Sequence, residues 1–408
     1  MRAGLGMLVA ALAVVLVDEL VDGTKSAALP LMRQGLRLTY GQLGLLASVP
    51  IVLGSLLELP LGVLAGHGRR RRLAVLGGGV AFILALVAVA AATSFTALLI
   101  AFVLFFPASG AFVSLTQSGL MDADPGRREQ HMARWELAGS VGSVTGPVLL
   151  VAVLAIGGSW RLAYLVLALI TVMAWLGVAR DGPGPTPSPG AVNPAEQDPA
   201  EQDQTRSGGA SAARRAIGVL RQAGVVRWLV LIEACDLLLD VLTGFLGLYL
   251  VDVVHATNTQ AALGVAIRLA AGLAGDAAAI RILERVPGLN VLRVSVVAAA
   301  LLYPGFLLVP GLWPKLLLLG CLSVVTAPWY PVLQAQLYRS LPGRSGVVVS
   351  LSSAAALLGG AVPVALGFLA QRYGLSWALT SLAVAPLCLL GGLWWRLGDA
   401  EPEGAPSA

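Results

Sequence analysis

Long apolar runs dominate the chain, and short polar segments separate them. Each run is about 20 residues long, the length with which an α-helix crosses the hydrocarbon core of a bilayer. The runs are unbroken, whereas the strands of a membrane β-barrel alternate apolar and polar residues. The pattern therefore predicts an all-α integral membrane protein with twelve transmembrane helices. They cover approximately 5–29, 41–65, 73–92, 95–120, 134–157, 160–179, 226–251, 260–283, 291–309, 313–338, 346–370 and 375–396.

One polar segment is much longer than the others and divides the chain. It follows the sixth run, and its first part, 181–213, is rich in Pro, Gly, Glu, Gln and Asp. The sequence Pro-Ala-Glu-Gln-Asp occurs there twice, beginning at Pro194 and at Pro199. This composition is typical of a flexible hydrophilic linker. The predicted organisation is an N-terminal six-helix half at 1–180, a linker at 181–225 and a C-terminal six-helix half at 226–408.

The two halves repeat each other at rare residue types. A shift of 218 residues brings Asp18 onto Asp236 and Asp22 onto Asp240. Because each half holds an even number of spans, the repeats run parallel and are related by an axis along the membrane normal. The other matches, at a shift of 218 or 217, are Gln42 with Gln260, Gly54 with Gly272, Glu58 with Asp276, Gln117 with Gln334, Pro125-Gly126-Arg127 with Pro342-Gly343-Arg344, and Ser159-Trp160 with Ser376-Trp377.

Composition and charge placement support this topology. Hydrophobic residues make up 57% and charged residues 12% of the chain, and a soluble protein this apolar could not cover its surface with polar groups. The net charge of +5 comes from Arg and Lys between the apolar runs, which indicates membrane topology rather than nucleic-acid binding. With the N-terminus inside, 20 of the 27 basic residues fall in inner segments and five in outer ones. We therefore predict a multi-pass protein of the cell (inner) membrane with both termini and the linker in the cytoplasm.

The sequence contains no signature of catalysis or of a bound group. Its three histidines lie between the apolar runs, and its three cysteines lie inside runs without metal-ligand spacing. It has no nucleophile elbow and no phosphate-binding loop. We therefore expect no enzyme activity, no cofactor and no metal. The expected partners of a monomeric chain are a small-molecule substrate, protons as the coupling ion and the lipid bilayer.

Two local motifs resemble those of a transporter family. The loop after the second span runs from Gly62 to Arg72 as GVLAGHGRRRR and is similar to the pattern G-x-L-A-D-R-x-G-R-R, with Gly66 in the acidic position. Span five carries Gly142-Ser-Val-Thr-Gly146-Pro147, which is similar to the G-x-x-x-G-P signature of exporters. With the duplicated halves, these motifs resemble the major facilitator superfamily over nearly the whole chain. The stretch 22–46 is similar to the fosmidomycin-resistance-type branch of drug exporters.

This resemblance implies that spans one and seven face each other across a central cavity. Asp18 and Asp22 lie one helical turn apart, and Lys25 continues the same stripe. Asp236 and Asp240 repeat that spacing in span seven, with Thr243 at the position of Lys25. A charge inside the bilayer costs about 2.5–3.5 kcal/mol on insertion scales, so we expect these carboxylates to bind protons or substrate. The alternative is that Lys25 merely neutralises Asp22.

Several further polar and aromatic residues are candidates for the cavity. Arg268, deep in the second half, is a buried counter-ion, a switchable partner for a span-seven Asp, or an anchor for an anionic substrate. Gln117 and Gln334 occupy repeat-related positions. Trp329 and Tyr330 lie between two prolines that break span ten, and they either stack on substrate or mark a packing kink.

A second set of residues suggests gating and hinge packing. Glu58 and Asp276 lie about two turns from the predicted cytoplasmic ends of their spans. We expect them to form inner gate contacts with Arg281, Arg285 or the basic cluster. That cluster consists of Arg69, Arg70, Arg71 and Arg72. In span five, small residues let helices approach closely at a hinge. They are Gly142, Gly146 and Pro147.

The sequence therefore predicts a secondary active transporter that works by alternating access. Proton-coupled efflux of a small amphipathic or cationic compound is the favoured function, because the exporter signature is present and acidic residues outnumber basic ones in the predicted cavity. Proton- or cation-coupled uptake and lipid flipping are the alternatives, and a membrane-embedded enzyme or sensor is the least favoured.

Overall fold

The computed structural model describes residues 2–65, 69–123, 128–181, 223–340 and 359–394, and this part of the chain is helical without any strand. Most of the predicted linker at 181–225 lies outside the described residues. The same holds for the start of the predicted eleventh span and for the repeated Pro-Gly-Arg segments at 125–127 and 342–344.

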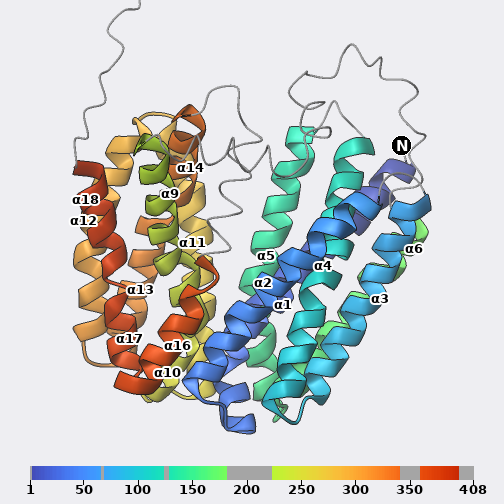
Figure 1. Cartoon of the computed structure of the whole chain (residues 1–408), viewed down its shortest axis with the longest axis horizontal. Coiled ribbons are helices and arrows are strands. Elements are labelled where there is room, and N and C mark those ends of the chain that lie inside the picture. The colour runs from blue at the N-terminus through green and yellow to red at the C-terminus, as the bar shows by residue number, and fades with distance from the viewer. Residues whose placement is uncertain (1, 66–68, 124–127, 182–222, 341–358, 395–408) are drawn as a thin grey trace, which may run out of the picture.

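Six helices form the N-terminal half (Figure 1). They are α1 (Arg2–Leu36), α2 (Tyr40–Ala65), α3 (Arg69–Ala91), α4 (Phe95–Ala123), α5 (Arg128–Ala155) and α6 (Trp160–Asp181). Most match the predicted spans to within a few residues. The exception is α1, which continues through Pro30 beyond the predicted span at 5–29 and ends at Leu36.

The C-terminal half also contributes six spans in the described residues, and three of them are interrupted. The seventh span has a π-helical turn in its middle, where the sequence predicted an unbroken helix. The spans are α9 (Ala223–Asp236) with η2 (Leu237–Val241) and α10 (Leu242–Asp252), α11 (Asn258–Leu283), α12 (Gly288–Leu308), α13 (Leu312–Thr326) with α14 (Trp329–Ser340), α16 (Val362–Tyr373), and α17 (Leu375–Ser381) with α18 (Val384–Trp394).

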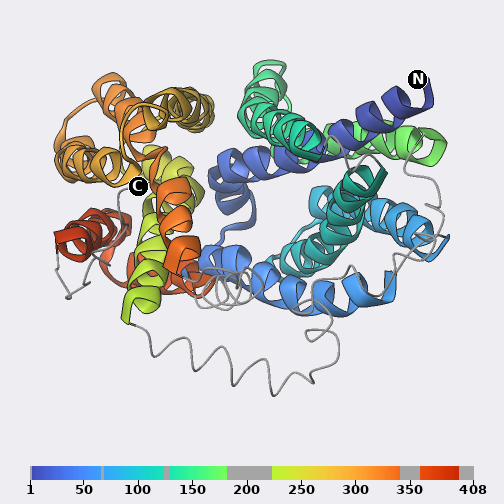
Figure 2. The ribbon, with the colours of Figure 1, turned by 90° about the horizontal axis from the view of Figure 1, so that it is seen from above.

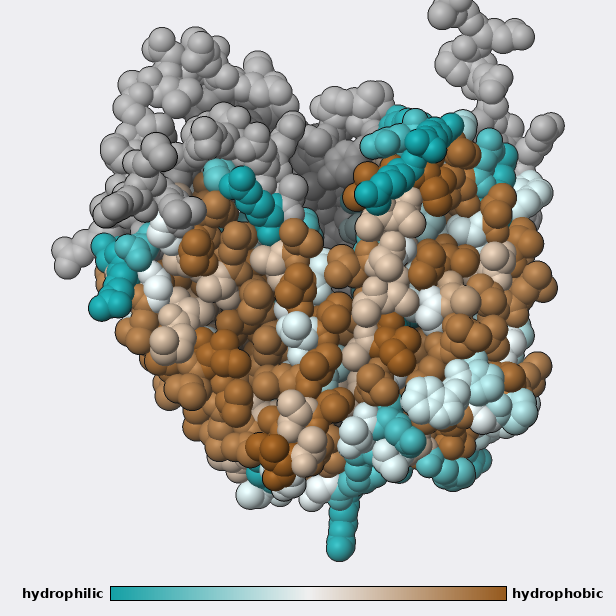
Figure 3. All heavy atoms as spheres, turned by 180° about the vertical axis from the view of Figure 1, so that it is seen from behind, coloured by the Kyte–Doolittle hydropathy of each residue, from teal (hydrophilic) through white to brown (hydrophobic). Residues whose placement is uncertain are grey.

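The outer surface is suited to lipid. Eight segments of the described residues are long and apolar enough to cross a membrane. Figure 3 shows that hydrophobic side chains cover most of the visible face between the two ends of the bundle. Large apolar side chains such as Leu301 and Leu308, 74% and 82% exposed, lie on this surface. A continuous apolar surface of this kind is unfavourable in contact with water but not in contact with lipid. The predicted all-α integral membrane fold is confirmed.

The internal duplication is visible in the backbone at the start of the second span of each half. Thr39 and Gln42 bond reciprocally before α2, with each side chain accepting from the other residue's backbone N–H. Thr257 and Gln260, 218 residues further on, form the same capping box before α11. Arg37 and His255 precede these caps at equivalent positions, and both have positive φ, +52° and +60°. The parallel six-helix repeats are therefore present in local geometry as well as in sequence.

Glycines bring α1 and α5 into close contact. A Cβ on Gly146 would lie 2.5 Å from the carbonyl oxygen of Leu20, and a Cβ on Gly142 would collide with that of Leu16. Conversely, a Cβ on Gly23 of α1 would collide with the carbonyl of Ser143 and lie 3.1 Å from Pro147 Cδ. Only glycine fits at these points. The predicted hinge residues of span five thus form the α1–α5 contact.

The two halves diverge towards one end of the bundle and meet at the other (Figure 1), and seen from above they lie side by side (Figure 2). We call the end where α6 ends at Asp181 and α9 begins at Ala223 the linker end, and the opposite end the closed end. Contacts between the halves run from α2 to α16, from α1 to α10 and from α5 to α11. The arrangement leaves room between the halves on the linker side of these contacts.

Candidate functional site

A polar cavity of about 560 Å³ lies between α5 of the N-terminal half and the C-terminal half. Three carboxylates line it, and Arg268 is the one basic residue among its lining side chains. The carboxylates are those of Asp236, Asp240 and Asp276. Hydroxyl groups complete the polar wall. They belong to Ser140, Ser143, Thr243, Ser323, Thr326 and Tyr330. We call this space the acidic cavity, because it holds three acidic groups against one basic group.

The π-helical turn shapes one wall of the acidic cavity. A π-turn widens a helix by one residue, and such turns often occur at functional sites. The turn covers Leu237–Val241, so Asp236 lies directly before it and Asp240 lies within it. Both residues line the cavity. Among the described residues, neither carboxylate forms a hydrogen bond or an ion pair within 4.0 Å. They are therefore available to a proton or a cation that enters the cavity.

Arg268 is buried at this wall, with only 5% of its surface exposed. Its Nε donates to Thr243 Oγ1 at 2.6 Å, and its Nη1 donates to Ser323 Oγ at 3.1 Å. Its Nη2 donates to the carbonyl oxygens of Leu238 and Leu239 in the π-turn. Arg268 is thus bound by neutral oxygens and forms no ion pair with Asp236 or Asp240 in this structure. The interpretation as a paired counter-ion does not describe this conformation.

The two aspartates of span one, Asp18 and Asp22, have partners of their own and do not line the acidic cavity. Asp18 accepts a hydrogen bond from Ser109 of α4 at 2.7 Å. Lys25 bonds Asp22 at 2.8 Å, and its ammonium lies 5.5 Å from the ring centre of Phe106. Asp22 is 61% exposed at its side chain.

The two aromatic residues of the proline-flanked segment have different surroundings. Tyr330 is 45% exposed and lines the acidic cavity. Trp329 is fully buried, and its indole N–H donates to Ser295 Oγ of α12 at 2.9 Å. Of the two alternatives, substrate stacking and a packing kink, the contacts of Trp329 favour packing, since it holds α14 against α12. Gln117 and Gln334 do not line the cavity.

The expected inner gate is not formed in the described residues. Asp276 lines the acidic cavity instead of pairing with Arg281, whose Nη1 donates to the carbonyl of Ala277 on its own helix. Arg71 is buried and donates through Nε and Nη2 to the carbonyl of Leu115 on α4. Arg72 donates to the carbonyl of Ala179. These arginines fasten α3 within its own half.

Three further residues belong to the predicted gate. Arg70 is exposed. The side chains of Glu58 and Arg69 lie outside the described part of the chain.

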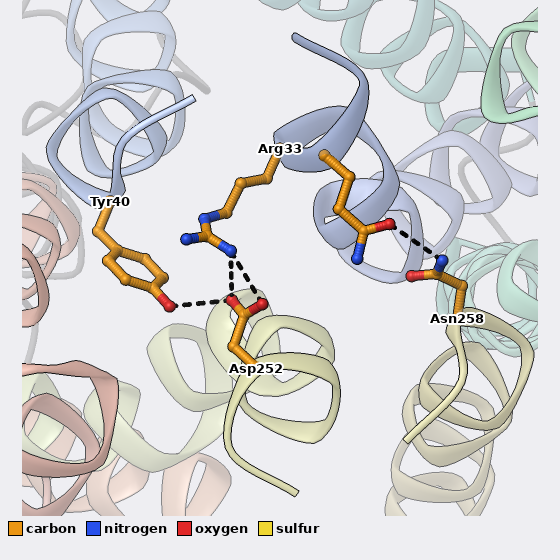
Figure 4. Close-up of polar contacts among 5 residues, drawn as sticks. Arg33, Tyr40, Asp252 and Asn258 are labelled. Carbon is orange, nitrogen blue, oxygen red and sulfur yellow. Dashed lines mark hydrogen bonds and ion pairs between the residues drawn. The ribbon is translucent and has the colours of Figure 1, made fainter. Parts of the chain in front are cut away.

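Polar contacts that sequence reasoning missed join the two halves at the closed end (Figure 4). Arg33 Nη1 donates to both carboxylate oxygens of Asp252, at 2.9 and 2.8 Å, and Tyr40 donates to Asp252 Oδ2 at 2.9 Å. Asn258 donates to Gln34 Oε1 at 3.2 Å beside them. We call these five residues the closed-end cluster. From the sequence, Arg33 counts only as one of the five outer basic residues, and Asp252 follows the end of its predicted span.

Further contacts close the same end between α2 and α16. The backbone N–H of Gly41 donates to Gln371 Oε1, and that of Val364 donates to Ser48 Oγ, each at 3.1 Å. Gly44 packs so closely on α16 that an added Cβ would lie 2.6 Å from the carbonyl oxygen of Pro363. All of these contacts cross from one half to the other and hold the two halves together at the closed end.

The two six-helix halves, the lipid-facing surface and the cavity between the halves define a membrane transporter of the twelve-helix type. The chain belongs to the Major Facilitator Superfamily, whose sequence profile matches residues 11–362. A comparison with curated proteins finds no relative.

Solved structures of transporters share this fold. A bacterial homologue of the human lysosomal transporter Spinster, in an inward-facing and occupied conformation, superposes with a TM-score of 0.74 at 14% identity, covering 95% of each chain. Its inward-facing and unoccupied form gives 0.71 at 15% identity, covering 96% of this chain and 95% of the other. The nucleoside transporter NupG gives 0.71 at 13% identity, covering 97% of this chain and all of the other.

Proposed function

We propose that this transporter exports a small amphipathic or cationic compound in exchange for protons. The observation that carries the proposal is the acidic cavity, where Asp236, Asp240 and Asp276 face a single basic group, Arg268. A cavity with this excess of carboxylate attracts cations and disfavours anions. The hydroxyl groups of its wall suit the polar part of an amphipathic cargo, and Tyr330 and Leu273 offer it an apolar surface.

The orientation that the basic residues predict is the one in which cargo loads from the cytoplasm, a step that export requires. The Arg and Lys bias towards the linker end, 20 against five, places that end in the cytoplasm. The contacts at the closed end then seal the outer side, and cargo enters the acidic cavity from the cytoplasm. The Gly142–Pro147 segment packs against α1, and its resemblance to the exporter signature supports export.

Proton coupling is assigned to the two pairs of aspartates on spans one and seven. Asp236 and Asp240 lack a direct counter-ion, so a proton and a cationic cargo compete for the same carboxylates. Binding of one releases the other, which is the elementary step of an antiporter. Asp18 and Asp22 stand opposite in the repeat and already have partners in Ser109 and Lys25. We assign them the exchange of the proton when the halves rock to the opposite state.

The proposal is tested with purified protein in proteoliposomes. A thermal-shift screen of cationic amphipathic compounds, each with a neutral or anionic analogue of matched size, supplies the cargo. Vesicles with an acidic lumen should accumulate the best-stabilising cation against its gradient, and the lumen should become more alkaline as they do so. Tighter binding of the anionic analogue would contradict the cation preference. With the pH gradient reversed, so that the lumen is alkaline, accumulation of the cation together with acidification of the lumen would instead support uptake by symport.

Neutral isosteres separate coupling from cargo movement. Asp236→Asn and Asp18→Asn are each expected to abolish accumulation driven by the pH gradient, while counterflow exchange partly survives. Asp181→Asn, an exposed carboxylate at the linker end, is the matched control and should behave as wild type. If both test variants keep wild-type uphill transport and its pH dependence, the coupling site is elsewhere, and Glu58, Asp276 or a sodium ion becomes the candidate.

A further inference from the structure

Four oxygen atoms from three segments surround the guanidinium group of Arg268. Two are the carbonyl oxygens of Leu238 and Leu239 in the π-turn, and the others are the hydroxyls of Thr243 on α10 and Ser323 on α13. Arg268 itself comes from α11, so the group ties three spans together. A guanidinium has five N–H donors in a planar fork. These contacts use its Nε and both Nη atoms, which leaves little capacity for an anionic cargo.

The equivalent place in the N-terminal half is built differently. Span one is a continuous α-helix there, and its cation, Lys25, pairs with Asp22 on the same helix. Thr243 occupies the position of Lys25 in the repeat and cannot pair with Asp240. The C-terminal half instead receives its positive charge from a neighbouring helix, and neutral oxygens hold that charge. Asp240 therefore lies near a cation without forming an ion pair.

The π-turn depends on such a partner. A π-turn leaves backbone carbonyls without the ordinary i+4 donor, and unpaired polar groups away from water are costly. Arg268 Nη2 donates to the carbonyl oxygens of Leu238 and Leu239 in the turn, and the Thr243 hydroxyl also donates to that of Leu239. If the turn relaxed to a regular α-helix, one residue would be absorbed, and the two sides of the turn would rotate by about 100° relative to each other. Asp240 and Thr243 would then move around the helix axis relative to Asp236 and leave their present places in the cavity wall.

We propose that Arg268 is a positioning residue whose guanidinium permanently occupies an oxygen-lined cation site and thereby keeps the π-turn, with Asp236 and Asp240, facing the acidic cavity. The site formed by Leu238, Leu239, Thr243 and Ser323 is a guanidinium site with a tethered ligand. This inference rests on the proposed function only in assigning proton and cargo binding to Asp236 and Asp240. It assigns Arg268 no contact with cargo, and so replaces the anion-anchor interpretation.

The direct test removes the tethered group and returns it in solution. Arg268→Ala leaves an oxygen-lined gap that opens onto the acidic cavity. Guanidinium chloride at low millimolar concentration, far below denaturing levels, should raise the melting temperature of this variant by about 2 °C or more, whereas sodium chloride at equal ionic strength should not. Wild type and Arg281→Ala should not respond. Arg281 is the matched control, because it lies on the same helix, is exposed and bonds only its own helix.

A second readout follows the position of Asp240 and does not depend on stability. The three native cysteines are replaced by serine, and Asp240→Cys is labelled with a cationic methanethiosulfonate reagent. Adding Arg268→Ala should slow labelling about tenfold, because the π-turn becomes a minor conformation, and guanidinium should restore the rate. Arg268→Lys should stay slow, since an ammonium cannot reach four oxygens at once. Asp276→Cys lines the same cavity away from the turn, and its labelling should not change.

The outcomes that overturn the proposal are defined for each variant. Unchanged labelling of Asp240→Cys beside Arg268→Ala contradicts it, and so does slow labelling that guanidinium fails to restore. If Arg268→Ala does not fold, Ser323→Ala removes one acceptor, and the same labelling rate must fall severalfold for the proposal to stand. None of these measurements uses a proton gradient or a cargo. A transporter that proves not to be a proton antiporter would therefore leave this inference standing.

Discussion

Asp252 joins the two halves at the closed end, so its substitution tests the conformational cycle directly. Asp252→Asn keeps the shape of the side chain but removes the charge that binds Arg33 and Tyr40. The side chains of Arg33 and Asp252 are 28% and 17% exposed, so solvent screens the pair only in part. A hydrogen-bonded contact to a charged group of this kind contributes about 1.5–3 kcal/mol.

Asp252→Asn removes this free energy only from the conformation in which the two halves meet at the closed end, as they do in this structure. Because about 1.4 kcal/mol corresponds to a factor of ten, the ratio of open to closed molecules should rise about 10- to 150-fold. A wild-type population that is about 1% open at this end would become about 10–60% open. The cycle would then favour the state that is open at the closed end, and cargo would load more slowly from the linker end.

Distance measurements between spin labels provide the assay. Labels at Arg37→Cys and His255→Cys, in a chain with the native cysteines replaced by serine, lie in exposed turns at the closed end on opposite halves. Double electron–electron resonance should show a second, longer distance in Asp252→Asn but not in the Asp181→Asn control. An unchanged distance distribution would refute the conclusion that this ion pair holds the halves together.

Three further predictions follow from close packing and from the cavity wall. Gly146→Val forces a side chain against the Leu20 carbonyl and should destabilise the protein by about 3 kcal/mol or more, seen as loss of monodisperse protein, whereas Gly177→Ala has 3.7 Å of clearance and should be tolerated. Trp329→Ala should cost about 3–5 kcal/mol of stability, measured by thermal unfolding, because Trp329 is fully buried. Tyr330→Ala should keep the melting temperature and weaken binding of the screened cation, because Tyr330 lines the cavity. The reverse result would mean that Trp329 is the cavity residue. Gly272→Leu adds a side chain where a Cβ meets nothing within 4 Å, so it should fill the acidic cavity, abolish cation binding in calorimetry and leave thermal unfolding unchanged.

Much of the fold could be predicted from the sequence, because membrane insertion imposes strong one-dimensional rules. Run length gives the spans, and rare residues such as Gln42 and Gln260 reveal the duplication, which the two capping boxes then repeat in three dimensions. The helical period also places Asp236 and Asp240 on one face, and both line the acidic cavity. These features depend only on neighbours along one helix.

The composition of the site depends on how helices pack against each other, and the sequence carries little information about that. Trp329 and Tyr330 are adjacent in sequence, yet one is fully buried and the other lines the cavity. The π-turn has no signal in the sequence Leu-Leu-Leu-Asp-Val, because its hydrogen-bonding partner, Arg268, lies on a different helix. Asp252 was overlooked because a single acid after a span is common, and its partners Arg33 and Tyr40 come from the other half.

The closed-end cluster also has an internal symmetry with a mechanical consequence. Under the 218-residue shift, Asp252 corresponds to Gln34 and Tyr40 to Asn258, so the Asp252–Tyr40 and Gln34–Asn258 contacts are one contact made twice across a pseudo-two-fold axis. Such an isologous interface opens symmetrically only if its two copies are equally strong. Here one copy carries the Arg33 charge and the other is an uncharged amide pair. The closed-end cluster is therefore strong on one side and weak on the other. We expect it to separate in order, with the Gln34–Asn258 contact breaking first and the Arg33–Asp252 ion pair breaking last.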